Sequence, residues 1–306
     1  MRVVVFGASG VQGSAQVSAL IRAGHHPVAV SRYPKPLTTD GQSIETASAE
    51  FSDVPALEKA LCGAEVIFLN LPSTSFQKAE PVIAAAKAIG EAAMRTPSVR
   101  FCVFNTSMPV PEETKHIEAQ DHRREMRRLL RDTGLQVISI QPVCYLDNFF
   151  EGWALPPIVE QNVLRYCHKP SLEASWICHD DLAQLMVAAL NRPDLAGRNI
   201  PVGGPETVRL EQVTEKLARA WDRPLKCDNE TVDDFCDRMG EAMRKRASLD
   251  VDRVIDQMRR AYTWYNDSPE DPFKIDMAPV LKELPVQLTT IEEWGRSVKH
   301  KLPVAV

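Results

Sequence analysis

The sequence predicts an α/β fold in which a doubly wound parallel sheet is joined to a smaller, mostly helical substrate region. Apolar runs of strand length alternate with helical patterns over residues 1–142, as in successive β-α-β units. After residue 142 this alternation stops, and from residue 206 onward the chain shows mainly helical patterns. This change of pattern predicts a sheet domain followed by a region of different architecture.

The first β-α-β unit carries a glycine-rich turn. The apolar run at 3–6 leads into Gly7, Gly10 and Gly13, spaced G-x-x-G-x-x-G, and a helical pattern follows at once. A strand, a turn of residues without a Cβ and a helix N-terminus form a corner that binds a pyrophosphate through backbone N–H groups. We therefore predict a Rossmann-type nucleotide site, with a glycine turn that merely ends a strand as the alternative.

The second strand, expected at 27–30, ends in Ser31 and Arg32. Rossmann folds that prefer NAD usually place an Asp or Glu about 20 residues past the glycine turn, where it accepts from the ribose 2′-hydroxyl. This chain has no carboxylate there, but Arg32 and, three residues on, Lys35. A guanidinium suits a 2′-phosphate in charge and geometry, so we expect NADP(H) rather than NAD(H). The alternative is a solvated surface arginine.

Short apolar runs and their flanking residues predict the remaining elements. We expect strands at 44–48, 66–72, 99–107, 135–142 and 200–204. Helices are expected at 54–62, 78–95 and 115–132, and a regular segment at 176–190 has an aspartate at its N-cap position. Further helical patterns cover 209–221, 231–240, 250–262 and 289–300.

The residues at the carboxyl ends of the strands are candidate site residues, because ligands bind outside these ends in open parallel sheets. Asn70, Leu71 and Pro72 end one central strand, and Asn105 and Ser107 end the next. Glu50 and Phe51 follow the 44–48 strand and could touch an adenine.

The expected helix at 115–132 is strongly basic. It carries five arginines, which we interpret as a solvated face on a packed helix: Arg123, Arg124, Arg127, Arg128 and Arg131.

The segment 143–157 is rich in aromatic residues and proline and has no clean periodicity. We interpret it as a loop over the strand ends and hence as a wall of the substrate pocket. Phe149, Phe150, Trp153 and the later Trp176 would line that pocket. The chain then divides into a cofactor domain at 1–150, to which 176–204 returns, and a substrate-binding region at 151–175 and 205–306.

The composition is that of an ordinary globular protein of 306 residues, with 44% hydrophobic and 25% charged residues. A net charge of −5 argues against a nucleic-acid partner. No apolar run reaches the length of a membrane span, and the N-terminus does not resemble a signal peptide. The seven cysteines show no C-x-x-C pair and no metal-ligand spacing. We therefore expect reduced thiols, no metal site and a cytoplasmic protein.

Together these segments resemble the NmrA-like branch of the atypical short-chain dehydrogenase/reductase superfamily. GASGVQG at 7–13 is similar to that family's GATGxQG, and SRYPK at 31–35 lies where NADP-favouring members keep a basic residue. QPVCYLDNF at 141–149 resembles RPxxFxxNF, and segments at 50–72 and 285–297 extend the resemblance over nearly the whole chain. The resemblance implies NADP(H) binding, with either reduction of a small organic substrate or redox sensing through partner proteins.

With the turn, the basic segment, the strand ends and the resemblance combined, we can name the expected ligand contacts. The substrate contacts are Asn148, Phe149 and Trp153. The cofactor contacts are Gly7, Ser9, Gly10, Val11, Gln12, Gly13, Arg32, Lys35, Glu50, Phe51, Asn70, Leu71, Pro72, Asn105 and Val143.

The Tyr-x-x-x-Lys pair common in short-chain reductases is absent. In that pair the Tyr donates a proton to the developing alkoxide, and the Lys lowers the pKa of the Tyr. Aligning Glu125 with the Glu of the family's K-x-x-x-E places Asp121 at the Lys position and Ile117 four residues earlier. The remaining candidates for proton transfer or substrate polarisation are Tyr145, His116 and Ser107 and, more weakly, His122 and Asp121.

Three functions stay open. The aromatic segment favours an NADPH-dependent reductase of a hydrophobic or aromatic quinone, enone or ketone. The missing Tyr/Lys pair favours a nucleotide-binding regulator without turnover. An isomerase or cyclase on the same fold is the third, since a fold does not fix a function. The expected ligand is a small molecule, and a protein partner or a homo-oligomer stays open.

Overall fold

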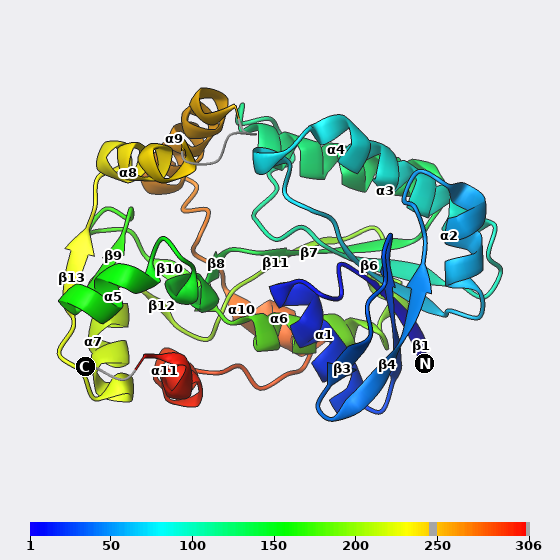
Figure 1. Ribbon diagram of the computed structural model, residues 1–306, viewed down its shortest axis with the longest axis horizontal. Helices are drawn as coiled ribbons and strands as arrows, with labels where there is room; N and C mark the ends of the chain where they lie inside the picture. Colours follow the sequence, from blue (N-terminus) through cyan, green and yellow to red (C-terminus); the bar gives the residue numbers. More distant parts are fainter. Residues whose placement is uncertain (245–249, 304–306) are drawn as a thin grey trace.

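An eight-stranded sheet forms the centre of the N-terminal part in a computed structural model that describes residues 1–244 and 250–303 (Figure 1). The strand order is β11-β7-β6-β5-β1-β2-β4-β3, and all neighbours are parallel except β3, which runs antiparallel to β4. The chain reverses its direction of travel across the sheet between β1 and β5, where ligands bind in such folds. The strands are β1 (Arg2–Phe6), β2 (His26–Ser31), β3 (Leu37–Thr39), β4 (Gln42–Ser48), β5 (Val66–Asn70), β6 (Phe101–Asn105), β7 (Val137–Pro142) and β11 (Asn199–Val202).

Helices cover both faces of this sheet, so its central strands β1, β5, β6 and β7 are buried on both sides. Val3 and Val5 of β1 belong to one core, with α1 (Val11–Arg22), α6 (His179–Ala189) and α10 (Met277–Glu283). Val4 and Phe6 point the other way, into a second core. This second core is formed with α2 (Val54–Leu61), α3 (Ala79–Met94) and α4 (Glu118–Asp132), which lie above the sheet in Figure 1.

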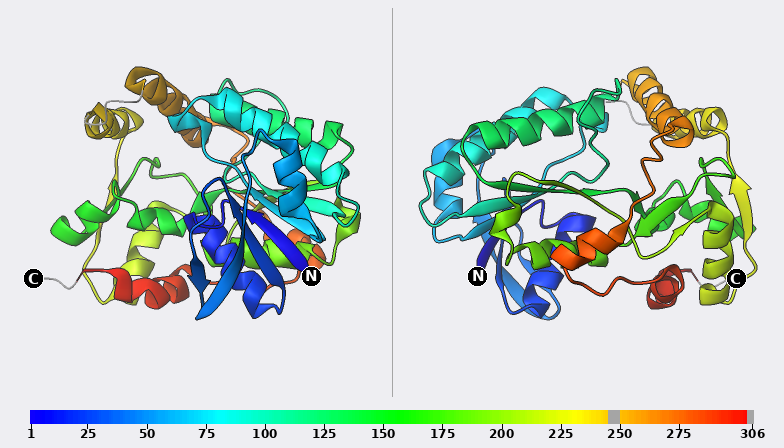
Figure 2. Two further views of the ribbon diagram at one scale, coloured as in Figure 1. Left: turned by 45° about the vertical axis from the view of Figure 1, so that its right-hand side comes forward. Right: turned by 180° about the vertical axis from the view of Figure 1, so that it is seen from behind.

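A third core lies in the part of the chain beyond β7, around Phe149, Trp176 and Trp294. It is built from two small sheets and a set of helices (Figures 1 and 2). One sheet contains β8 (Cys144–Tyr145), β10 (Ala174–Ile177) and β12 (Thr207–Val208). The other contains β9 (Val163–Tyr166) and β13 (Lys226–Asn229). The helices are α5 (Leu155–Gln161), α7 (Leu210–Trp221), α8 (Val232–Arg244), α9 (Val251–Asp267) and α11 (Ile291–Val298).

The predicted doubly wound sheet with a more helical C-terminal part is confirmed, although the C-terminal part also holds short strands. The interpretation of 143–157 as a loop is wrong, because the segment forms β8, a 3-10 helix η2 (Leu146–Phe150) and the start of α5. These elements could not be recognised from the sequence, because each is too short to show a periodic pattern of apolar residues. The division into a cofactor domain and a substrate region stays a prediction.

The arginines of α4 do not all lie on a solvated face. Arg123 and Arg127 are only 2% and 3% exposed, so that interpretation is wrong for these two. Arg123 lies three residues before Met126 and Arg127 three residues before Leu130, on the buried side of the helix. Arg127 pairs with Glu112 at 2.8 Å, whereas Arg123 points toward the end of β5.

All seven cysteines are free thiols. In the two described ranges, no helix combines the length and the apolar character needed to cross a membrane.

Candidate active site

The glycine turn between β1 and α1 is built for close approach. Gly7 has a φ of 74°, and a Cβ on Gly13 would lie 2.1 Å from the carbonyl oxygen of Gly7. The N-cap residue of α1, Gly10, offers no side-chain cap, and the first turn holds no acidic residue. The N–H groups of that turn therefore stay available for an anion, which the helix dipole favours. These features fit a pyrophosphate.

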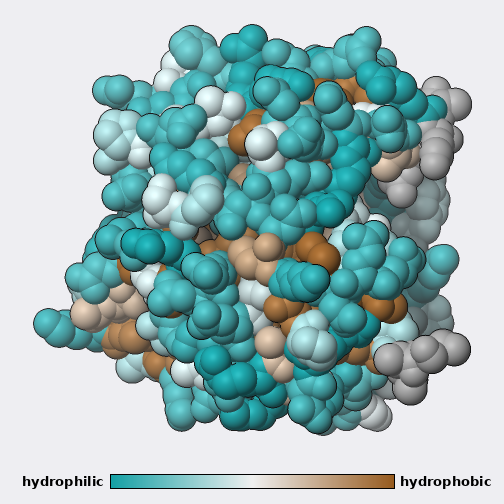
Figure 3. Space-filling view, turned by 90° about the vertical axis from the view of Figure 1, so that its left-hand side faces the viewer, coloured by the Kyte–Doolittle hydropathy of each residue, from teal (hydrophilic) through white to brown (hydrophobic). Residues whose placement is uncertain are grey.

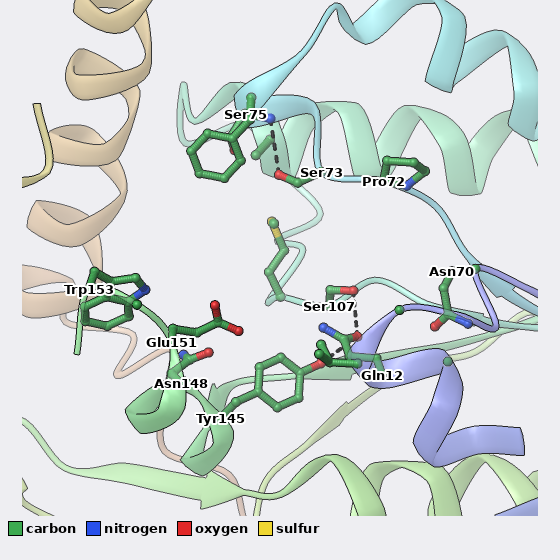
Figure 4. A pocket seen from close by; sticks show the side chains of 18 of the residues that line it. Gln12, Asn70, Pro72, Ser73, Ser75, Ser107, Tyr145, Asn148, Glu151 and Trp153 are labelled. Atoms are coloured by element: carbon green, nitrogen blue, oxygen red, sulfur yellow. Dashed lines mark hydrogen bonds between the residues drawn. The ribbon is translucent and has the colours of Figure 1, made fainter. Parts of the chain in front are cut away.

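A cavity of about 1980 Å³ begins at this turn. The ends of β1, β2 and β5 and the residues just after β6 line one end of it, and α8 and α9 line the other. Figure 4 shows Tyr145 between these two ends, with Gln12 and Ser107 on one side and Asn148, Glu151 and Trp153 on the other.

Gln12 joins three elements at the turn end of the cavity. Its side-chain oxygen accepts hydrogen bonds from Asn105 Nδ2 at 2.6 Å, Ser107 Oγ at 3.0 Å and the Tyr145 hydroxyl at 3.3 Å (Figure 4). Ser107 has a φ of 62°, which is uncommon without glycine, and its N–H donates to Asn105 Oδ1 at 2.9 Å. These bonds hold a hydroxyl and a phenol beside the glycine turn.

Asn70, at the end of β5, is oriented by Gln16 of α1. Gln16 is fully buried, and its Nε2 donates to Asn70 Oδ1 at 2.8 Å. Asn70 Nδ2 in turn donates to the backbone oxygen of Phe6 at 2.9 Å. Sequence reasoning missed Gln16, although a glutamine on the buried stripe of an amphipathic helix is a usable signal.

Tyr145 is almost entirely buried, at 6% exposure, and packs edge-on against the ring of His179 with centroids 4.6 Å apart. Burial and the negative charge of Asp147 raise the pKa of Tyr145 well above its usual value, with a smaller opposing effect from Arg123. The raised pKa keeps the phenol protonated at neutral pH, so its hydroxyl can donate a hydrogen bond, although it is a weaker acid than a free tyrosine.

The structure brings most of the predicted cofactor residues to the cavity. Asn105 lies behind it and contacts Gln12, whereas Glu50 is exposed and does not line it. Only Phe51 of that pair turns inward, with its ring 5.3 Å from that of Phe6. The lining residues are Gly7, Ser9, Gly10, Val11, Gln12, Gly13, Arg32, Lys35, Phe51, Asn70, Leu71, Pro72 and Val143.

Of the catalytic candidates, Tyr145 and Ser107 line the cavity and the others do not. His116 is exposed in the loop before α4. The carboxylate of Asp121 is engaged by Arg124 at 2.7 Å and by Thr114 at 2.8 Å. His122 Nδ1 lies 2.9 Å from Thr74 Oγ1.

Asn148 and Trp153 line the cavity as expected, but Phe149, Phe150 and Trp176 do not. Phe149 and Trp176 are fully buried and stack at 5.2 Å in the third core. Within η2, Asn148 faces the cavity and the next residue, Phe149, points into the third core. Tyr145 at the end of β8 and Glu151 just after η2 line the cavity on either side of Asn148. The expectation that all four aromatics line the pocket is wrong for three of them.

Arg123 is a site residue that sequence reasoning missed. Its guanidinium donates to the backbone oxygens of Leu71 at 2.8 Å and Pro72 at 3.2 Å and borders the cavity. No carboxylate pairs with it in the described part of the chain, and burial lowers its pKa to about 10. Its i, i+3 relation to Met126 was the available signal.

Within residues 1–244 and 250–303, no group of three or more His, Cys, Asp or Glu side chains is placed to hold a metal ion.

The model of the NmrA-like family matches residues 1–295 of this chain. The chain is 31% identical, over 76% of its length and 78% of the relative, to a (4-alkanoyl-5-oxo-2,5-dihydrofuran-3-yl)methyl phosphate reductase of Streptomyces griseus.

Two solved structures share the fold. An NADPH-dependent quinone oxidoreductase of Escherichia coli, complexed with NADPH, superposes with a TM-score of 0.71 at 18% identity, covering 97% of this chain and 99% of that one. NmrA, a negative transcriptional regulator in complex with NADP, gives a TM-score of 0.73 at 16% identity, covering 98% and 95%.

Proposed function

The chain belongs to the NmrA-like family, and from this premise we propose that it is an NADPH-dependent reductase of a hydrophobic conjugated carbonyl compound, an enone or a quinone. The observation that carries the proposal is the hydroxyl of Tyr145, which lies in the cavity 3.3 Å from Gln12 of the glycine turn. A hydroxyl donor beside a pyrophosphate cradle is an arrangement that suits reduction by a nicotinamide.

Three features support NADP(H) as the cofactor. The glycine turn has the geometry and the free N–H groups for a pyrophosphate. Arg32 and Lys35 lie at the end of β2, exposed and bordering the cavity. Neither forms an ion pair with another described residue, so both charges are free for a 2′-phosphate. The names of two structural neighbours also specify NADPH or NADP for those proteins.

When bound, the reduced nicotinamide supplies a hydride to the electrophilic carbon of the substrate. The electron pair displaced from the conjugated system then gathers on the carbonyl oxygen. Tyr145 transfers its phenolic proton to that oxygen, and the phenolate regains a proton from solvent. Ser107 Oγ donates to the same oxygen of Gln12, so a second hydroxyl group lies beside the phenol and could polarise the carbonyl oxygen.

The test is NADPH consumption with a panel of enones, quinones and ketones, in the wild type and in Tyr145→Phe. We expect turnover with a conjugated carbonyl compound. In the variant, kcat should fall by about 10²-fold or more, as for loss of a general acid. NADP+ affinity, measured by calorimetry, should stay unchanged. Full activity of Tyr145→Phe, or no oxidation above background by the wild type despite tight NADPH binding, would contradict the proposal.

A regulator without turnover is the second candidate, and one observation favours it. Asp121 occupies the position of the family's lysine, and its carboxylate is engaged by Arg124 away from the cavity. A regulator predicts different affinities for NADP+ and NADPH and a partner protein retained by only one of the two loaded forms. Equal retention of all proteins by both forms contradicts it.

A further inference from the structure

The cavity is larger than a dinucleotide requires. Its volume is about 1980 Å³, whereas pockets that enclose a single drug-sized ligand measure about 300–1,000 Å³. The glycine turn and the strand ends line only one end. There is room for a second ligand, and the lining of the other end indicates its chemistry.

We call that other end the distal chamber, lined by Trp153, Phe235, Met239, Met258 and Tyr262. Its rings pack edge to face, with centroids 4.9 Å apart for Phe235 and Tyr262 and 5.6 Å apart for Trp153 and Phe235. Figure 3 shows apolar residues gathered at mid-height on this side of the molecule, with hydrophilic residues above and below. Unbranched methionine side chains adapt to ligands of variable shape, so the chamber suits a flexible apolar group.

The two guanidinium groups beside the distal chamber are each paired with a carboxylate. Arg238 forms two hydrogen bonds with the carboxylate of Glu230, at 2.9 and 2.7 Å, and donates to the backbone oxygen of Trp153. Arg165 pairs with Asp228 at 2.6 Å. Because each guanidinium has its own carboxylate, this end offers no unpaired cation to an anionic ligand. The aromatic and methionine lining and the paired guanidinium groups therefore favour an apolar group without negative charge.

Helix α9, which lines the distal chamber, is bonded to residues at the start of α4 and just before it. The side-chain oxygen of Gln257 in α9 accepts from the N–H of Glu118 at 2.9 Å, and Lys115 pairs with Glu270 at 2.6 Å. These bonds hold α9 beside the N-terminus of α4, as Figures 1 and 2 also show. The chamber and the Tyr145 phenol therefore belong to one continuous site, joined along the face of η2 that carries Asn148.

We propose that the distal chamber binds an uncharged, flexible alkyl or acyl chain of the substrate, while the conjugated carbonyl group lies at Tyr145. The inference rests on the proposed function for the head group. The chamber itself can be tested by binding alone, without turnover.

The first test measures binding of 1-alkanols, from butanol to decanol, to the NADP+-loaded wild-type protein, by calorimetry or by the fluorescence of the chamber tryptophan. We expect affinity to rise by about 4-fold for each methylene that enters the chamber. Decanoate should bind at least 10-fold more weakly than decanol, because no free cation meets its carboxylate. Affinity independent of chain length, or decanoate binding as tightly as decanol, overturns the proposal.

The second test fills or enlarges the chamber. Met258→Trp should abolish the gain for long chains, and Met258→Ala should move the best chain length upward, with NADP+ affinity unchanged in both. Met94→Trp is the matched control, because Met94 is 52% exposed on α3 and does not border the cavity. Wild-type chain-length profiles in both Met258 variants overturn the proposal.

The two levels of inference fail in different ways. If alkanols bind but no enone is reduced, the proposed function is wrong and the proposed role of the chamber still stands. If enones with short and long chains are reduced at equal kcat/KM, the proposed role of the chamber is wrong and the reductase function still stands.

Discussion

At the scale of single residues, the site depends on two glutamine side chains that orient the polar atoms around them. Gln12 gathers the hydroxyl groups of Ser107 and Tyr145, and Gln16 orients Asn70. Both glutamines belong to α1, so one helix positions the polar groups at the ends of three strands. A change at either glutamine would disturb several contacts at once.

Arg123 is a buried guanidinium that holds two backbone oxygens at the end of β5. Arg123→Met keeps the apolar volume but leaves the oxygens of Leu71 and Pro72 without their donor. We expect NADP+ affinity to fall by about 5- to 10-fold, the equivalent of one net hydrogen bond. The matched control is Arg124→Met one residue further on, whose calorimetric Kd for NADP+ should equal that of the wild type. Equal affinities in both variants would contradict this role.

His168 predicts the acid sensitivity of the fold. It is 1% exposed among Tyr166, Trp176 and Phe273, its ring nitrogens have no hydrogen-bond partner, and burial lowers its pKa to about 3. The unfolded chain, with a histidine pKa near 6.5, binds the proton first, so the free energy of unfolding should fall as the pH drops from 6.5 toward 3. The loss amounts to about 1.4 kcal/mol per unit of difference between the two pKa values.

Replacing the histidine should remove part of that pH dependence. We expect the unfolding free energy of His168→Leu to change less between pH 7 and pH 4.5 than that of the wild type, measured by denaturant titration. The exposed His300→Leu serves as control and should follow the wild type. Identical pH profiles for His168→Leu and the wild type would refute this account.

At the scale of elements, the period of each short segment decides which side chains meet the cavity. In η2, Asn148 faces the cavity while its neighbour Phe149 points into the core. In the same way, the buried face of α4 includes Arg123 as well as Met126. From composition we expected the aromatic residues of 143–157 to line the pocket and the arginines of α4 to be solvated. In both segments, the position of each residue in its short element or helix decided instead which side chains are buried.

The turn between β1 and α1 tolerates no side chain at its third glycine. A Cβ at Gly13 would lie 2.1 Å from the backbone oxygen of Gly7, so Gly13→Ala must push α1 away from β1. We expect NADP+ binding to weaken by more than about 10²-fold and the unfolding free energy to fall by about 1–3 kcal/mol.

The same substitution elsewhere gives the control. Gly240→Ala in α8 places a Cβ 3.5 Å from Ile255, an ordinary contact, and should stabilise the helix by about 0.5–1 kcal/mol. Thermal melts and calorimetric titrations of both variants check the pair. Tight NADP+ binding by Gly13→Ala would show that the turn does not approach the cofactor.

At the scale of the whole molecule, the cofactor should stabilise the protein, because the glycine turn and the C-terminal helices border one cavity. A ligand at 100 times its Kd stabilises the folded state by about 2.7 kcal/mol. We expect NADP+ to raise Tm by several degrees, and NAD+ at equal concentration to raise it less. Arg32→Glu should abolish the difference, measured by thermal melts. A larger shift with NAD+ would remove the proposed preference.

The sequence alone predicted the sheet, the order of most of its strands and helices, and the glycine turn, because each depends on residues that are neighbours in the chain. An apolar run, a turn without Cβ atoms and a helical period over residues 3–22 are local signals. Tyr145 and Asn148 could also be placed at the cavity, since they lie in one segment that resembles a family motif, and Trp153 follows that segment by a few residues.

Only the tertiary structure decided which of the remaining polar groups meet. Gln12 and Tyr145 are 133 residues apart in the chain, and Arg123 reaches the carbonyl of Leu71 across 52 residues. The tertiary structure also places α8 and α9 at the cavity, whereas His116 and Asp121 do not line it. No local pattern encodes these outcomes, because they follow from how separate helices pack on the sheet and which of their faces become buried.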